Sequence, residues 1–140
     1  MKKIFSKEQK VKFSHCDLAG IVFYPRFMEM LNELVEDWFE EALDYSFLSM
    51  HPNNGIPTVD LQVQFRTAAR LGDVLIKKLW VTELTEKSLT YAFEFTCKDK
   101  TVLKGTAVLV HVTLDKIKGG IKAGNWHKET RKHISSYRIS

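Results

Sequence analysis

Residues 15–43, HCDLAGIVFYPRFMEMLNELVEDWFEEAL, decide the fold of this 140-residue chain. From Pro25 onward the apolar residues recur at steps of three and four, which predicts a helix over residues 25–43 with one apolar face. That face carries Phe27, Met30, Leu31, Leu34, Val35, Trp38, Phe39, Ala42 and Leu43. Acidic residues take the opposite face. At 1.5 Å per residue the helix is about 28 Å long, and so wide an apolar stripe needs a sheet to cover it.

The segment before this helix predicts a tight turn that carries one carboxylate. Asp17 and Gly20 occupy the first and fourth positions of an expected type I turn. Pro25 suits the first helical position, because its missing N–H would be unpaired there. The turn is therefore expected to hold Asp17 near a helix N-terminus with free backbone N–H groups, which suits attack on an acyl carbonyl. By spacing alone, an Asp in Asp-x-x-Gly is most often a turn former.

The rest of the chain predicts strands. Alternation of apolar and polar residues indicates strands at 9–14, 59–65, 74–83 and 89–97, of which 74–83 alternates less cleanly and fits a bulged strand. Residues 107–112 are apolar at nearly every position, which predicts a strand covered on both faces. We expect a loop at 45–57 and a hairpin turn at Asp99–Lys100. This order predicts an α+β domain, with a mostly antiparallel five-stranded sheet wrapped around one long helix.

A length of 140 residues favours a single domain over residues 1–140. No apolar run is long enough for a signal peptide or a membrane span. Two cysteines, Cys16 and Cys97, do not suggest a disulfide framework. We therefore expect a reduced, cytoplasmic setting. The net charge of +4 is modest, and no nucleic-acid-binding module is visible, so neither nucleic acid nor a membrane is an expected partner.

Charge is nevertheless uneven along the chain. The helix carries an acidic block, and residues 115–140 form a basic tail in which residues 126–134 fit a short helix. The tail's cations are Lys116, Lys118, Lys122, Lys128, Arg131, Lys132 and Arg138. Two interpretations stay open. Both regions are solvated surfaces, or part of the tail lies near an anionic ligand.

A thiol nucleophile is a weaker hypothesis. His15 and Cys16 are neighbours on an expected extended segment, so their side chains point to opposite faces. Cys16 is expected to pack inward as a small apolar residue. We predict no metal, because the histidines lack metal-ligand spacing with cysteine or acidic partners. They are His15, His51, His111, His127 and His133.

Residues 16–25 resemble the signature of the 4-hydroxybenzoyl-CoA thioesterase family of hotdog-fold proteins. The match runs Cys16-Asp17-x-Ala19-Gly20-Ile21-Val22-aromatic-aromatic-Pro25, and residues 55–59 and 69–74 are also similar to family segments. The resemblance extends to about Leu114. It implies a hotdog fold and an acyl-CoA thioesterase, which hydrolyses a thioester to free acid and CoA with no cofactor besides the CoA of the substrate. A hydrolase of acyl carrier protein thioesters and a non-catalytic acyl-CoA-binding domain are the alternatives.

The resemblance also implies catalytic roles for Asp17 and Tyr24. Asp17 corresponds to the family's nucleophile or general base, and the backbone N–H of Tyr24 to the donor that polarises the thioester carbonyl. An exposed carboxylate is already ionised at neutral pH, which suits a nucleophile better than a base. Pro25 has no N–H, so Tyr24 offers the last donor before the helix body. The helix dipole there favours developing negative charge.

Substrate binding and assembly follow from the same resemblance. The substrate-binding residues that it implies are Phe23, Pro57, Thr58, Lys87 and Ser88. Lys87 and Ser88 correspond to a segment that meets CoA phosphates from a neighbouring subunit. Thr85 and Glu86 stand where the best-known member has arginines, so Arg66, Arg70 or the basic tail could substitute. The strand at 59–65 corresponds to a sheet edge, which predicts a homodimer or, where two such dimers associate, a homotetramer.

Overall fold

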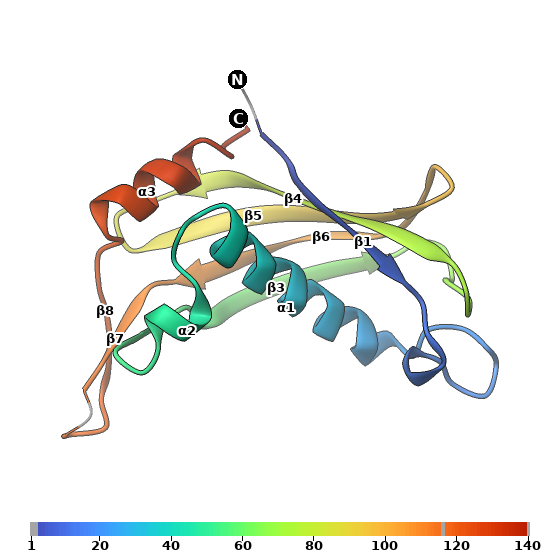
Figure 1. Cartoon of the computed structure of the whole chain (residues 1–140), viewed down its shortest axis with the longest axis horizontal. Coiled ribbons are helices and arrows are strands. Elements are labelled where there is room, and N and C mark those ends of the chain that lie inside the picture. The colour runs from blue at the N-terminus through green and yellow to red at the C-terminus, as the bar shows by residue number, and fades with distance from the viewer. Residues whose placement is uncertain (1–2, 116, 140) are drawn as a thin grey trace.

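The computed structural model describes residues 3–115 and 117–139, which fold as a curved sheet around one long helix (Figure 1). The helices are α1 (Tyr24–Glu41), α2 (Phe47–Met50) and α3 (Lys128–Ser135), with a 3-10 turn at Phe13–His15. The strands are β1 (Phe5–Lys10), β2 (Asn54–Gly55), β3 (Thr58–Phe65), β4 (Val74–Leu84), β5 (Ser88–Cys97), β6 (Lys100–Val110), β7 (Val112–Leu114) and β8 (Ile121–Ala123).

The main sheet is antiparallel throughout, with strand order β1-β4-β5-β6-β3. A smaller sheet has the order β2-β7-β8. Helix α1 crosses one face of the main sheet (Figure 1). The predicted α+β class, with five strands around one helix, is confirmed. The edges of the main sheet are β1 and β3.

Helix α1 is held to the sheet by the predicted apolar stripe. Its buried residues are Phe27, Met30, Leu31, Leu34, Val35, Trp38 and Phe39. They share one core cluster with the inward series of β5, which includes Phe93 and Phe95. Full burial of such a side chain stabilises a fold by about 1.5–3 kcal/mol, so this stripe fixes the helix position. The helix runs from Tyr24 to Glu41 rather than over 25–43, and Pro25 is its second residue.

The strand predicted at 9–14 lies elsewhere. Strand β1 spans Phe5–Lys10, and the chain then makes the 3-10 turn at Phe13–His15. Alternation along β1 is hidden because polar residues occupy its inward positions. Lys7 pairs with Glu41 of α1, and Gln9 accepts a hydrogen bond from Lys77 Nζ. Long polar side chains thus replace apolar ones on the inward face.

Strand β6 is longer than predicted, and it begins at Lys100 instead of Ala107. The hairpin turn lies at Lys98 and Asp99, both with positive φ, one residue before the predicted position. A Cβ at Gly105 would lie 1.9 Å from the Gln62 carbonyl oxygen of β3. The glycine that breaks the apolar pattern therefore allows β3 and β6 to approach each other.

Of the remaining predictions about the fold, some are confirmed and others are wrong. The short helix near the C-terminus is confirmed as α3, and the bulge in β4 lies between Val81 and Glu83. Coverage of residues 107–112 on both faces is wrong for this chain, because Val108 and Val110 are only half-buried. The expected loop at 45–57 contains α2 and β2.

Candidate active site

The turn that carries Asp17 is closed by its own hydrogen bonds. The Gly20 N–H donates to the Asp17 carbonyl at 3.0 Å, and the Ala19 N–H donates to Asp17 Oδ1 at 2.9 Å. Gly20 has a φ of +76°, which glycine adopts without strain. The predicted turn is confirmed. Asp17 is exposed, and among the described residues its Oδ2 has no hydrogen-bond partner and no cation pairs with it.

A second loop supports this turn. The Val22 N–H donates to Ala69 O at 2.9 Å, and the Leu71 N–H donates to Gly20 O at 3.2 Å. That loop is itself fixed by Asp73, whose Oδ2 accepts from the Arg70 N–H at 2.9 Å. Residues 69–74, which the sequence comparison with the family pointed to, therefore support the turn before α1 through backbone hydrogen bonds.

The Tyr24 N–H is available to a ligand. Helix α1 begins at Tyr24, and the Arg26 N–H already donates to Phe23 O at 2.8 Å. Within residues 3–115 and 117–139, the Tyr24 N–H has no acceptor. It lies at the positive end of the helix dipole, where it can stabilise developing negative charge. The Tyr24 ring is exposed and lies edge-on to Phe65, the last residue of β3, at 6.3 Å between centroids.

Cys16 and His15 do not form a nucleophile pair. His15 lies at the end of the 3-10 turn, not on an extended segment, and its Nδ1 accepts from the Lys12 N–H at 2.9 Å. Cys16 packs against the core, as predicted, and its thiol is 3.6 Å from Lys12 O. The imidazole therefore does not activate the thiol.

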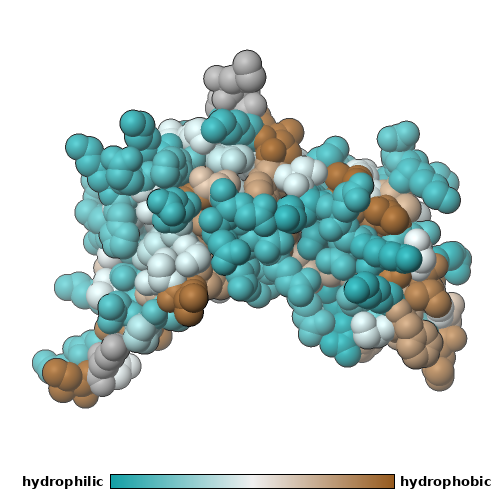
Figure 2. Space-filling model, in the orientation of Figure 1, coloured by the Kyte–Doolittle hydropathy of each residue, from teal (hydrophilic) through white to brown (hydrophobic). Residues whose placement is uncertain are grey.

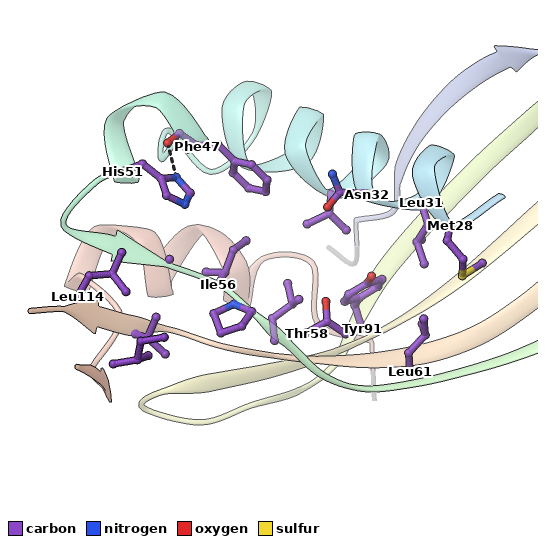
Figure 3. Close-up of a pocket in the computed structure, with 16 residues that line it drawn as sticks. Met28, Leu31, Asn32, Phe47, His51, Ile56, Thr58, Leu61, Tyr91 and Leu114 are labelled. Atoms are coloured by element: carbon purple, nitrogen blue, oxygen red, sulfur yellow. Dashed lines mark hydrogen bonds between the residues drawn. The ribbon is translucent and has the colours of Figure 1, made fainter. Parts of the chain in front are cut away.

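A pocket of about 530 Å³ lies between α1 and β3 (Figure 3). This volume is within the range of sites that hold small organic ligands. Its lining is mostly apolar, and the two predicted residues Pro57 and Thr58 belong to it. The full set is Met28, Leu31, Asn32, Val35, Phe47, His51, Gly55, Ile56, Pro57, Thr58, Leu61, Tyr91, Leu109, Val112, Leu114 and Ile121.

The polar groups of the pocket come from Asn32, His51, Thr58 and Tyr91. His51 Nδ1 lies 2.8 Å from the Phe47 carbonyl oxygen, which can only accept (Figure 3). Nδ1 is therefore the ring nitrogen that donates in this contact. Sequence reasoning did not find His51 or Tyr91. Tyr91 was hidden because it alternates with Leu89 and Phe93 as an ordinary inward residue of β5.

One chain does not bring all the predicted site residues together. Asp17, Phe23 and Tyr24 do not line the pocket, and neither do Lys87 and Ser88. The last two lie at the turn between β4 and β5, at the end of the molecule opposite the start of α1 (Figure 1). The turn preceding α1 exposes apolar surface (Figure 2), to which Leu18, Phe23 and Tyr24 contribute.

A basic groove lies beside the turn that joins β4 to β5 and carries Lys87. Its cations are Lys128, Arg131, Lys132 and Arg138, and Glu86 and Glu129 also line it. Among the described residues, none of these cations lies within 4.0 Å of a carboxylate. Trp126 ties this segment to the turn, because its backbone N–H donates to Glu86 O and its Nε1 to Ser88 O. The groove can accept an anion.

In the part of the chain that the structure describes, no helix is long and apolar enough to cross a membrane. No group of three or more His, Cys, Asp or Glu side chains is placed to hold a metal ion in residues 3–115 and 117–139.

Comparison with known proteins assigns the family. The sequence model of the thioesterase-like superfamily matches residues 11–132, and the chain belongs to that superfamily. This membership places it among the thioester hydrolases as a class of enzyme. A 1,4-dihydroxy-2-naphthoyl-CoA hydrolase from Synechocystis sp. is 25% identical over 111 residues, which are 79% of this chain and 80% of the relative.

Solved structures confirm the hotdog fold. A 1,4-dihydroxy-2-naphthoyl-CoA thioesterase from Synechocystis superposes with a TM-score of 0.83 and 20% identity, over 95% of this chain and 96% of the other. A Staphylococcus aureus protein in complex with CoA superposes with a TM-score of 0.85 and 13% identity, over 100% and 89%. These findings support the superfamily, whereas the narrower 4-hydroxybenzoyl-CoA thioesterase family is not confirmed.

Proposed function

We propose that this protein hydrolyses acyl-CoA thioesters to a free acid and CoA. The observation that carries the proposal is the free Tyr24 N–H at the start of α1, directly after the turn that presents Asp17. A carbonyl oxygen that accepts from Tyr24 would gain negative charge as its carbon is attacked. Removal of one such donor typically costs a hundredfold to a thousandfold in rate, about 3–4 kcal/mol.

Asp17 can act in either of two ways. As a nucleophile, its carboxylate attacks the thioester carbon, forms a mixed anhydride and releases the CoA thiolate, which takes a proton from water; a second water then opens the anhydride. As a general base, Asp17 takes a proton from the water that attacks the carbon, the C–S bond then breaks, and Asp17 returns the proton to the departing CoA thiolate. We favour the nucleophile, because the exposed, unpaired Oδ2 is ready to attack.

We propose that the complete site is shared by two subunits. Strand β3 is a sheet edge that exposes Val59, Leu61 and Phe65, and exposed edges of this kind readily pair. Two copies of β3 paired antiparallel would place the first residues of one strand beside the last residues of the other. Thr58 lines the pocket at the start of β3, and Phe65 contacts Tyr24 at its end. The pocket of one subunit would then open toward Asp17 of its partner.

The same pairing gives a place for the CoA phosphates. Lys87 and Ser88 of one subunit would approach the partner's Asp17 turn, because antiparallel pairing brings opposite ends together. Lys87 is exposed, and among the described residues it has no carboxylate partner. The basic groove beside it, with Lys128 and Arg131, offers further cations. Phosphate groups bind such clusters through charge-assisted hydrogen bonds.

A hydrolase of acyl carrier protein thioesters is the second candidate function. The observation that favours it is the same basic groove on α3, since a positive patch attracts a protein partner that presents a negative surface. The discriminating experiment measures thiol release from one acyl group carried on CoA and on an acyl carrier protein. Higher kcat/KM with the CoA thioester supports the proposal. Turnover of the carrier-protein thioester alone would favour the second candidate, and turnover of neither would leave a binding domain.

A further inference from the structure

Tyr91 is a buried tyrosine of β5 whose side chain lines the pocket (Figure 3). Its residue surface is only 2% exposed. Its hydroxyl makes no hydrogen bond within residues 3–115 and 117–139. Burial raises the pKa of the Tyr91 phenol, so the hydroxyl stays protonated at neutral pH. It can therefore both donate and accept one hydrogen bond.

An unpartnered hydroxyl is unusual in a protein interior, because buried polar groups are normally paired. The buried Tyr45 is paired in this way, since its hydroxyl lies 2.7 Å from His111 Nε2. Trp38 Nε1 is the exception: among the described residues, it is the one buried side-chain polar atom, sealed from solvent, that has no hydrogen-bond partner. Tyr91 differs from both residues, because its hydroxyl is unpaired among the described residues, is not one of the atoms sealed from solvent, and belongs to a residue that lines the pocket.

We propose that the Tyr91 hydroxyl is a specificity-determining group, which hydrogen-bonds a polar substituent on the acyl moiety inside the pocket. The inference rests on the proposed acyl-CoA hydrolysis and assigns a residue to its selectivity. The pocket that Tyr91 lines is mostly apolar, with Leu31, Val35 and Leu109 in its wall. A plain hydrocarbon acyl group would displace water and leave the hydroxyl unpaired, whereas a hydroxylated acyl group would pair with it.

The physical consequence is discrimination against the unsubstituted acyl group. A site built to hydrogen-bond a substrate hydroxyl rejects an analogue that lacks it, because the buried protein group then loses its partner. The contact is made in the bound substrate, away from the thioester carbon, so it should act on KM more than on kcat. Tyr91→Phe removes the oxygen and keeps the ring. The variant should therefore accept the unsubstituted acyl group better than the wild type does.

The test compares 1,4-dihydroxy-2-naphthoyl-CoA with 2-naphthoyl-CoA on the wild type, Tyr91→Phe and Tyr137→Phe. Tyr137 is half-buried against Trp38, outside the pocket, and serves as the matched control. We expect Tyr91→Phe to lower the kcat/KM ratio of hydroxylated to unsubstituted substrate about tenfold, the size of one hydrogen bond. Tyr137→Phe should leave that ratio within twofold of wild type. An unchanged ratio in Tyr91→Phe would overturn the proposal.

Binding separates this inference from the proposed function. Titration calorimetry with 1,4-dihydroxy-2-naphthoate and 2-naphthoate needs no turnover, and Tyr91→Phe should again reduce the preference about tenfold. Activity without a Tyr91-dependent preference would overturn the inference and spare the proposed function. A Tyr91-dependent preference in binding without turnover would overturn the proposed function and support the inference about Tyr91. The Tm of Tyr91→Phe should not fall, because the hydroxyl has no partner to lose, and a large fall would indicate a structural role instead.

Discussion

A mixture of two inactive variants should recover activity if two subunits share each active site. Asp17→Asn removes the charge of the carboxylate, while its amide oxygen can still accept from the Ala19 N–H and keep the turn. Asn32→Trp places an indole in the pocket of about 530 Å³, from an exposed position on α1 that leaves the core intact. Each variant alone should retain at most about one per cent of the wild-type kcat/KM.

Random pairing makes about half of the dimers in an equal mixture heterodimers. In a heterodimer, one site combines Asp17 from the Asn32→Trp subunit with the open pocket of the Asp17→Asn subunit. The other site has neither. The mixture should therefore reach about a quarter of the wild-type activity per subunit, which is far above either variant alone.

The assay is thiol release after the two variants have been refolded together. Leu48→Trp is the matched control, because Leu48 is 88% exposed and lies on α2 outside the pocket lining. Leu48→Trp should keep wild-type activity. Its mixture with Asp17→Asn should show no more activity than the Leu48→Trp subunits in that mixture contribute by themselves. A mixture of Asp17→Asn and Asn32→Trp that stays as inactive as its components would refute the shared site.

The edge of β3 would supply the energy for the proposed dimer. Val59, Leu61 and Phe65 are 60%, 42% and 52% exposed, so pairing can bury about half of each side chain. That contributes about 1 kcal/mol per side chain and about 6 kcal/mol per dimer, before backbone hydrogen bonds between the two edges are added. Light scattering at micromolar concentration should therefore show a dimer or a tetramer. A monomer at that concentration would contradict the pairing.

Three further predictions test the fold, its pH response and the phosphate contacts. Gly105→Ala should lower the free energy of unfolding by about 3 kcal/mol in denaturant titration, because its Cβ would meet the Gln62 carbonyl at 1.9 Å; an unchanged midpoint would contradict the close approach of β3 and β6. Burial lowers the pKa of His111 in the folded state, so the unfolded chain binds a proton first. The free energy of unfolding should fall as pH drops below about 6.5, by at most about 1.4 kcal/mol per pH unit, and His111→Phe should lose that part of the slope. Lys87→Ala should raise KM for acyl-CoA about tenfold with little change in kcat, and if it does not while Arg131→Ala does, the α3 groove holds the phosphates.

The sequence predicted the helix and the turn best, because both have strong local signals. The apolar residues of α1 recur at helical steps, and Asp17 with Gly20 marks a turn that needs one glycine with positive φ. The β1 strand was misplaced because Lys7 and Gln9 fill inward positions and hide the alternation. The start of β6 was missed because Gly105 interrupts the apolar run for a reason that lies in β3, far away in the sequence.

The candidate site was predictable only in part. The turn and the Tyr24 N–H are local features; the structure closes the turn as predicted, and it makes Tyr24 the first residue of α1 rather than the last residue before it. The pocket is not local, because it is assembled from α1, the segment 47–58, β5, β6 and the small sheet. Tyr91 and His51 stand out only when the burial of one and the hydrogen bond of the other to Phe47 are known. Sequence patterns do not carry that information.

Thiol release from a panel of acyl-CoA thioesters by the wild type and by Asp17→Asn tests the central claim most directly. The substitution removes one charge and keeps the hydrogen bond to the Ala19 N–H, so the turn and the Tm should be unchanged. We predict that the wild type turns over at least one thioester of the panel, and that the variant loses at least about a hundredfold in kcat on that thioester. A variant with normal Tm that keeps kcat within about threefold of wild type would show that Asp17 does not carry the chemistry.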